Sequence, residues 1–474
     1  MIDLGGDVRR HPQLSGTTHN VFGIQTGVAI CFLVKNKARK GFTLHFADRN
    51  FLEKAEDKLS FLSSGQIGDM AFREIRPRSH GRWLDARETD FESFAPISEM
   101  TGGRNPFPGY IFHLGAPGVM SGRDEWVYSR RQDSLRPKIE FLHDALEGAQ
   151  LDGSIDLTKV IKTSSTLSSR RSSSQRSPSS VVESAWRPFQ DRWFYFNLDM
   201  VDRLTENHVG MFGEGGTERN TVIAFLGVAS SHPLAAFATR HVYDYGLLKT
   251  GNGGTQGVSR YRYTKSGERV DNITDWALKS FVAHFGKRAD ITKDAIFHYV
   301  YAVLHDPIYR ETYAPNLKRE FPRIPFYLDF ASWAAWGEAL MTMHIGYEDV
   351  EPWVVERIDA PKKRAKGTHP RPILQSVPEQ RLVRVDDETQ IAGIPREAWD
   401  YRLGNRSAID WVLDQHKEKI LRYPTIREQF NTYRFADYKE GMLTLLARVV
   451  RVSVNTVAIT QAMKASNRPS AAVH

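Results

Sequence analysis

The chain has 474 residues, of which 41% are hydrophobic and 25% charged, and its formal net charge is +8 at pH 7. This length and hydrophobic content exclude a wholly disordered chain and predict two or more folded domains. The single cysteine, Cys31, excludes an internal disulfide framework and indicates a reducing compartment. The positive excess suits a polyanionic partner such as nucleic acid, although ordinary solubility charge explains it equally well.

The first informative segment is residues 19–34. Here an apolar stretch, the turn Gln25-Thr26-Gly27 and seven successive apolar residues predict a β-hairpin. Because residues 28–34 show no polar alternation, we expect this strand to be covered on both faces inside a sheet, with Cys31 buried and inert. Few partner strands precede it, so the pattern favours the closing strands of a larger domain that is truncated at its start.

The composition along the chain predicts three regions. Residues 1–145 are expected to form the first domain, with polar loops and short elements from about residue 50. A Ser/Arg-rich linker follows over 146–184, because residues 163–184 lack the apolar content needed to build a core. It is either a mobile basic linker or a tether whose arginines track phosphates. Residues 185–474 are expected to form the second domain.

Helices dominate the last part of the chain. Apolar residues at helical spacing predict helices over Thr292 to His305, with Thr292 as the N-cap, and over Asp329 to Tyr347. Two more are predicted over Asn405 to Lys417, capped by Asn405 or Ser407, and over Tyr438 to Met463. The last has an apolar face wider than a surface helix needs, which predicts packing against the body of the protein.

Several signatures of catalysis are absent from the sequence. There is no G-x-x-x-x-G-K-[ST] phosphate loop, no Cys/His cluster with metal-ligand spacing, and no Asn/Asp-Pro-Pro-aromatic motif of the kind that holds an adenine amino group. We therefore expect no catalytic residue, no metal site and no bound cofactor here. No run approaching the ~18–20 apolar residues of a membrane span was identified, so we expect a cytoplasmic protein.

Three ordered blocks of sequence carry a family resemblance: Asn272-Ile273-Thr274-Asp275-Trp276-Ala277-Leu278, Ile296-Phe297-His298-Tyr299-Val300-Tyr301 and Leu317-Lys318-Arg319-Glu320-Phe321-Pro322-Arg323-Ile324-Pro325-Phe326. They resemble the C-terminal target-recognition region of Type ISP restriction-modification enzymes. The resemblance covers nearly the whole chain and is weakest in the linker.

The resemblance implies a mixed α/β fold. The closing strands of a methyltransferase-like sheet would be followed by a target-recognition domain with a helical C-terminal bundle. The implied partner is double-stranded DNA, and the implied role is to direct N6-adenine methylation and ATP-dependent cleavage. S-adenosylmethionine and ATP/Mg would serve the complete enzyme and bind outside this chain. Two alternatives remain: a DNA-binding subunit of a split methyltransferase that docks on an upstream polypeptide, or an inactive truncated fragment.

The resemblance also suggests site residues. Phe22 falls where the family commonly places an aromatic that stacks on the flipped target base, and the alternative is a strand-core residue. Arg123, in the segment Arg123-Asp124-Glu125-Trp126-Val127-Tyr128, is expected to contact phosphate or to pair with Asp124 and close a loop.

Two further basic groups are candidate DNA contacts. Arg260 and Arg262 alternate with Tyr261 and Tyr263 on a possible strand, where arginine can reach guanine edges, unless these arginines are merely solvated. The sequence departs from the family pattern at this strand. Lys318, Arg319 and Arg323 lie in a family signature and are expected to anchor phosphates or to form scaffold salt bridges.

Trp186-Arg187-Pro188-Phe189 matches an aromatic-Arg-Pro-Phe element of the family. It resembles a junction between the methyltransferase and the recognition module. The rigid proline and the aromatic rings favour a structural role for Trp186, Arg187 and Phe189 over contact with bases.

Overall fold

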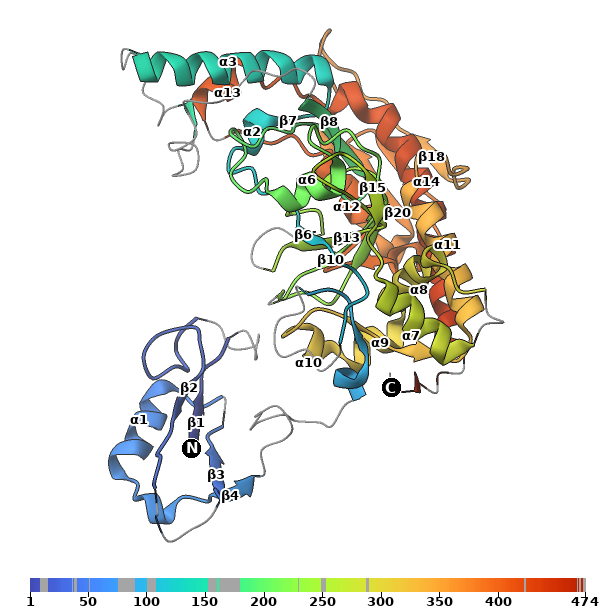
Figure 1. The fold of residues 1–474 in the computed structure, drawn as a ribbon. Coiled ribbons are helices and arrows are strands. Elements are labelled where there is room, and N and C mark those ends of the chain that lie inside the picture. Colours follow the sequence, from blue (N-terminus) through green and yellow to red (C-terminus); the bar gives the residue numbers. More distant parts are fainter. Residues whose placement is uncertain are drawn as a thin grey trace. The chain divides into compact units, whose positions relative to one another are not determined.

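The protein is shown in Figure 1 as a computed structural model. It describes residues 1–8, 16–35, 37, 41–50, 52–75, 90–99, 108–151, 160–161, 180–228, 230–248, 253–286, 290–421, 423–466, 468 and 470–471. The chain packs as two units, Met1–Thr89 and Asp90–His474. The packing thus divides between residues 89 and 90 and not at residue 145, and most of the expected linker lies outside the described residues.

Unit 1 contains a four-stranded sheet in the order β2-β1-β3-β4. β1 pairs antiparallel with β2, with Ile2 opposite Ile30, and parallel with β3, with Ile2 opposite Ala47. The strands and the accompanying helix are β1 (Ile2–Gly5), β2 (Val28–Ile30), β3 (Leu44–Asp48), α1 (Ala55–Ser64) and β4 (Arg73–Ile75).

The expected hairpin over residues 19–34 is not formed. Residues 16–26 are turns and bends, and the strand that follows has only three residues and pairs with β1 at the edge of the sheet. Cys31 is exposed, and Leu33 and Val34 are 89% and 91% exposed. The predictions of a strand covered on both faces and of a buried cysteine were therefore wrong, because an apolar run does not by itself supply the neighbouring layers that would cover it.

The central sheet of unit 2 has the order β11-β10-β13-β6 and separates two hydrophobic cores. Strand β10 is buried along its whole length. Val222, Ala224 and Leu226 pack into one core, and Ile223 and Phe225 into the other, as the two-residue period of a strand requires. The four strands are β6 (Gly115–Pro117), β10 (Val222–Leu226), β11 (Ala236–Thr239) and β13 (Thr255–Ser259).

A second sheet of unit 2 has the order β12-β8-β9-β7. Its centre is the hairpin of β8 and β9, and β7 pairs antiparallel with β9 next to the long helix α3 (Figure 1). The elements are α2 (Asp124–Val127), β7 (Tyr128–Ser129), α3 (Gln132–Leu151), β8 (Val181–Arg187), β9 (Gln190–Tyr195) and β12 (Val242–Tyr243).

A third sheet, in the order β18-β21-β20-β19, was not predicted from the sequence. Its strands are β18 (Glu356–Asp359), β19 (Pro372–Val377), β20 (Leu382–Asp386) and β21 (Thr389–Ala392). Short two-stranded ladders complete the strands: β5 (Ala95–Pro96) with β16 (Arg323–Ile324), β14 (Tyr261–Tyr263) with β15 (Arg269–Asp271), β17 (Phe326–Tyr327) with β24 (Ser470–Ala471), and β22 (Arg402–Leu403) with β23 (Arg406–Ser407).

The predicted helices are confirmed, with small changes at their ends. Thr292 caps α8 by accepting a hydrogen bond from the Ala295 amide at 3.0 Å, and Ser407 rather than Asn405 caps α12. The helices that follow α3 are α6 (Glu206–Phe212), α7 (Asp275–Phe285), α8 (Lys293–His305), α9 (Pro307–Thr312), α10 (Ala314–Leu317), α11 (Phe330–Ile345), α12 (Ala408–Gln415), α13 (Pro424–Gln429) and α14 (Lys439–Ala465). With these sheets and helices, the mixed α/β class is confirmed.

Helix α14 contacts α11 and α12, and its apolar face enters the core as expected. The helical segment Phe435–Ala465, which includes α14, is by length and composition alone able to cross a membrane. This was not predicted from the sequence. Half of the most apolar window of this segment is buried inside the protein, a pattern typical of a core helix.

Candidate functional site

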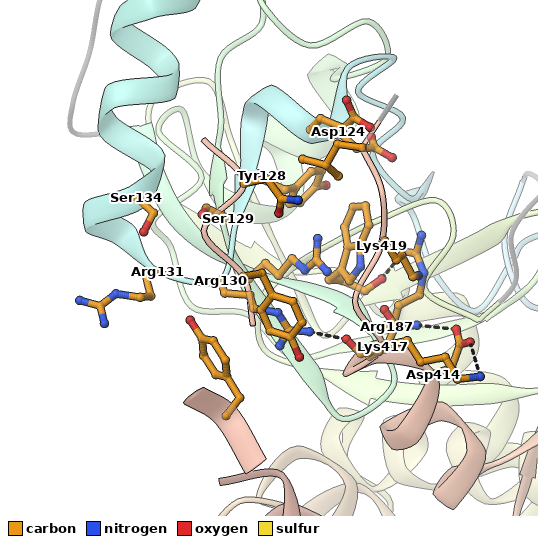
Figure 2. A pocket seen from close by; sticks show the side chains of 18 of the residues that line it. Asp124, Tyr128, Ser129, Arg130, Arg131, Ser134, Arg187, Asp414, Lys417 and Lys419 are labelled. Atoms are coloured by element: carbon orange, nitrogen blue, oxygen red, sulfur yellow. Dashed lines mark hydrogen bonds and ion pairs between the residues drawn. The ribbon is translucent and has the colours of Figure 1, made fainter. Parts of the chain in front are cut away.

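A cavity of about 580 Å³ opens in unit 2 beside the β8–β9 hairpin (Figure 2). Segments that are far apart in the sequence line it: residues 124–138 of α2, β7 and α3, the β8–β9 hairpin, His232, residues 405–421 around α12, and residues 430–438. The core beneath is aromatic, with Tyr128 stacked on Phe194 at 4.6 Å between ring centroids and packed against Trp186. Rigid strands and buried rings therefore fix the inner wall of this cavity.

Positive charge dominates the lining. The cationic side chains are Arg130, Arg131, Lys138, Arg187, Arg192, Arg406, Lys417 and Lys419, whereas the carboxylates are Asp124, Glu125 and Asp414. We call this site the basic cavity. Its excess of cations is much denser than the modest excess of the chain as a whole.

Some of these cations are neutralised by carboxylates. The Arg187 guanidinium lies 2.7 Å from the carboxylate of Asp244, which is not a lining residue. Asp414 pairs with Arg406 at 2.9 Å and with Lys417 at 3.6 Å. These pairs fix the side chains in place and contribute little net charge to the cavity.

Four cations have no carboxylate within ion-pair distance among the described residues: Arg130, Lys138, Arg192 and Lys419. Arg130 donates to the Gln415 carbonyl and stacks on Tyr433, 4.5 Å from the ring centroid. Lys138 donates to the Tyr128 carbonyl at 3.3 Å.

Arg192 lies over the Trp186 ring at 4.4 Å, and its Nε is buried without a hydrogen-bond partner in the part of the chain that the structure describes. The partners shown for Arg130, Lys138 and Arg192 are thus neutral carbonyl oxygens and aromatic rings.

Burial, and to a lesser extent the neighbouring cations, lowers the pKa of two of these side chains. Burial, together with the nearby guanidinium groups of Arg130 and Arg187, lowers the pKa of Arg192 to about 9. Burial and the proximity of Arg192 lower the pKa of Lys138 to about 8. Both side chains remain mostly protonated at pH 7, so the cavity carries repulsive positive charge that an anion would offset.

A second hollow, of about 440 Å³, lies beside β9, β11 and β12 and has mixed charge. In it, His241 lies 3.8 Å from the Glu183 carboxylate and 3.6 Å from the Asp191 carboxylate. Across the described residues, no three His, Cys, Asp or Glu side chains gather in a way that could hold a metal ion.

Three of the arginines expected to contact DNA are enclosed by the protein. Arg123 is 4% exposed and lies 2.7 Å from the Asp202 carboxylate, so its partner is not Asp124 as the alternative reading expected. Arg260 is 7% exposed and pairs with Asp271 at 2.7 Å and with Asp294 at 2.5 Å. These contacts favour the structural role for both side chains.

Arg323 is 4% exposed and pairs with Glu320 at 3.1 Å, which corresponds to the scaffold salt bridge and not to the phosphate anchor. Its neighbours in the signature differ, because Lys318 and Arg319 are exposed after α10. Arg262 is half-buried in β14, and its Nε is also buried without a hydrogen-bond partner among the described residues. Lys318, Arg319 and Arg262 therefore remain candidate contacts.

Phe22 lies in unit 1 and is 73% exposed in a turn, so the strand-core alternative is wrong. The Asn20 side chain builds this turn: its oxygen accepts from the Phe22 amide at 3.0 Å, and its amide donates to the Thr26 carbonyl at 2.7 Å. An ordered turn that presents an exposed aromatic ring is compatible with stacking on a base, which stays a prediction.

The expected junction of Trp186, Arg187 and Phe189 lies inside unit 2, at the turn between β8 and β9. Phe189 is 1% exposed and packs edge-on against Phe237 and Tyr347, with ring centroids 5.2 and 5.3 Å away. The packing role is as expected. Trp186 and Arg187 also line the basic cavity, which no local pattern had indicated.

The uncompensated cations of the basic cavity were missed by reasoning from the sequence. Arg130 lies two residues after Tyr128, the last residue of the segment Arg123-Asp124-Glu125-Trp126-Val127-Tyr128, and this proximity was the available signal. Lys138, Arg192 and Lys419 stand in stretches without a motif, so only the fold brings them together.

The chain belongs to the family of Type ISP C-terminal specificity domains, whose family model matches residues 110–445. This confirms the resemblance read from the sequence. A search of curated proteins finds no match.

Solved structures are similar to the chain over nearly its whole length. The chain of the DrdV–DNA complex solved by cryoEM is 37% identical, with a TM-score of 0.76 and coverage of 98% of this chain and 47% of that chain. Two others show the fold alone. One is a nuclease-deletion mutant of the Type ISP restriction-modification enzyme LlaGI in complex with a DNA substrate mimic, with 22% identity, a TM-score of 0.67 and coverage of 98% of this chain and 43% of that chain. The other is the ATP-dependent Type ISP restriction-modification enzyme LlaBIII bound to DNA, with 21% identity, a TM-score of 0.71 and coverage of 98% of this chain and 31% of that chain. The chain spans less than half the length of each of these proteins.

Proposed function

We propose that this chain is the sequence-specific duplex-DNA recognition module of a Type ISP restriction-modification enzyme. In this proposal it directs N6-adenine methylation and ATP-dependent cleavage that other domains carry out in the cytoplasm. S-adenosylmethionine and Mg-ATP would be bound by those domains, since the sequence has neither the phosphate loop nor the adenine-binding motif.

The observation that carries the proposal is membership of the specificity-domain family over residues 110–445, joined to 37% identity with DrdV, which was solved as a DNA complex. The basic cavity supports it, because dense positive charge on a folded surface suits a phosphate backbone. We further propose that Lys318, Arg319 and Arg262 contact DNA and that Phe22 stacks on the flipped base.

Unit 1 supports a connection to further catalytic sequence. It exposes several large apolar side chains: Phe22, Ile24, Phe32, Leu33, Val34, Phe42, Leu52, Leu59 and Ile67. Exposed apolar side chains that form a contiguous patch mark an interaction surface. We propose that the methyltransferase domain covers it, whether it belongs to the same polypeptide or to a separate subunit.

Selection from a pool of random duplexes tests the proposal directly. The 474-residue chain is incubated with the pool, bound DNA is recovered and sequenced, and the enriched duplex is then titrated at several salt concentrations. We expect one short motif to be enriched. We also expect log K to fall linearly with log salt, with a slope of about −0.9 for each phosphate contacted.

A duplex with the motif scrambled but the same base composition serves as the matched control. It should bind more weakly with a similar salt slope, because backbone contacts are common to both duplexes. A folded chain that binds neither duplex at low salt, or enriches no motif, would refute the proposed function.

A further inference from the structure

Four cations around the basic cavity, Arg130, Lys138, Arg192 and Lys419, lack a carboxylate partner in the described part of the chain. Lys138 is 8% exposed, and the Nε of Arg192 is buried. Charges removed from water without a counterion destabilise a fold, by several kcal/mol per ion where burial is complete. The described residues thus leave a charge imbalance that a bound anion would remove.

The shape and chemistry of the cavity indicate which anion would bind. Its volume of about 580 Å³ lies in the range of small-ligand sites, and two guanidinium groups offer planar forks of N–H donors. Such forks match the oxygens of a phosphate, and the ammonium groups of Lys138 and Lys419 add charge without demanding a fixed geometry. A phosphate group satisfies more of these donors than a carboxylate would.

Aromatic rings border the cations on one side. Tyr433 and Tyr438 lie 5.1 Å apart between ring centroids, and Arg130 lies over both, at 4.5 and 5.5 Å from the two centroids. Figure 2 shows the Arg130 side chain among the other cationic side chains of the lining. Rings beside arginines are suited to the sugar or base attached to a phosphate, so a phosphate carried by a nucleotide fits better than a bare ion.

We propose that the basic cavity is a binding site for a phosphate group, supplied by the backbone of the bound DNA. The DNA source rests on the proposed function, whereas the phosphate chemistry rests on the cavity alone. A free nucleotide would present the same group, so the experiment distinguishes the two sources.

Two variants test the site. Arg130→Gln removes a guanidinium whose oxygen partner is the neutral Gln415 carbonyl. Lys138→Met replaces a buried ammonium by an apolar chain of similar length. The matched control is Arg396→Gln, because that side chain is 60% exposed and does not line the cavity.

Stability separates a binding role from a structural role for Lys138. If the ammonium is held for a ligand, Lys138→Met relieves repulsion with Arg192 and leaves the ligand-free protein as stable as the parent or more stable. If Lys138 only supports the fold, the same change lowers the urea midpoint, which would count against the proposal.

Binding is measured for the motif duplex, its scrambled control, ADP and inorganic phosphate, at fixed salt. For a backbone phosphate, both duplexes weaken about tenfold or more in each cavity variant, and the salt slope shrinks by about one. For a free nucleotide, duplex binding is unchanged and ADP binds the parent but not the variants. The Arg396→Gln protein behaves as the parent in either case.

The proposal is overturned if both cavity variants bind duplex, ADP and phosphate as the parent does. The proposed function would still stand in that case, provided the parent enriches a motif. Conversely, a parent that binds ADP in the cavity but no duplex would leave the phosphate site intact and remove the DNA source.

Discussion

Replacing Gly337 by alanine tests how closely helices α8 and α11 are packed. A Cβ atom on Gly337 would lie 1.8 Å from the backbone oxygen of His298 and 2.5 Å from its carbonyl carbon. Ordinary contacts of this kind exceed 3 Å, and a backbone atom cannot rotate out of the way. The two helices would therefore have to separate by more than 1 Å, roughly the shortfall of the shorter contact.

Two opposing effects decide the sign of the change. Alanine is favoured over glycine inside a helix by about 1 kcal/mol. Overpacking in a core costs about 1–3 kcal/mol and occasionally more. Because both clashing atoms are main-chain atoms of the largely buried helix α8, we expect the upper end of that range or beyond. The net loss in the free energy of unfolding should be about 2 kcal/mol or more.

Urea unfolding followed by tryptophan fluorescence measures the difference, since Trp333 and Trp336 lie on α11 itself. The control is Gly441→Ala in α14, where a Cβ would meet no atom within 4 Å. Helix propensity then acts alone, and stability should rise by up to about 1 kcal/mol. A Gly337→Ala protein as stable as the parent would refute the close approach of the two helices.

Further predictions concern acid stability and the candidate contacts. His208 is buried in the first turn of α6, and burial lowers its pKa to about 4. The neutral ring therefore contributes its full stability above the unfolded pKa of 6.5. This contribution is lost as pH falls from 6.5 to 4, at ~1.4 kcal/mol per pH unit and about 3 kcal/mol in all. His208→Gln keeps a side chain that can complete the capping box of α6. The urea midpoint of this variant should therefore fall less steeply with decreasing pH than that of the parent. An equal fall in both proteins would contradict the burial of His208. Arg123→Gln breaks a buried ion pair and should cost about 3–5 kcal/mol of stability, whereas the double change Lys318→Gln and Arg319→Gln should leave the urea midpoint within about 0.5 kcal/mol and weaken duplex binding in a gel shift. If Arg123→Gln weakened duplex binding without loss of stability, and the double variant lost stability without weaker binding, Arg123 would again be a candidate DNA contact. Phe22→Ala removes an exposed ring, so the fold should be unaffected, and once the methyltransferase domain is supplied, base-flipping fluorescence should fall about tenfold or more from the loss of base stacking; unchanged fluorescence would exclude the stacking role.

Local signals in the sequence predicted α8, α11, α12 and α14, whereas α3 and α7 were not predicted. Thr292 was predicted as a cap, and Ser407 as one of two candidates with Asn405, because an N-cap side chain bonds to an amide only two or three residues ahead. Continuous apolar runs were less informative. Residues 222–226 form a strand buried on both faces, whereas residues 31–34 of a similar run follow the edge strand β2 and are exposed. What differs is the set of neighbouring layers, which the run itself does not encode.

The candidate site could not be predicted for a related reason. Arg123 finds its carboxylate 79 residues away in Asp202, and Arg130 reaches a carbonyl 285 residues away in Gln415. No local pattern distinguishes an arginine that will be paired over such a distance from one that will stay unpaired. The sequence therefore identified basic residues correctly but could not separate the enclosed ones from those left to face a ligand.

The short strands between residues 90 and 130 determine how this module could be transplanted. They complete sheets whose other strands come much later: β5 pairs with β16, β6 with β13 and β7 with β9. A graft that began at residue 185 would remove one strand from each of these pairs and leave exposed edge strands that are prone to aggregation. Engineers who wish to exchange target specificity between relatives should therefore place the crossover close to residue 90.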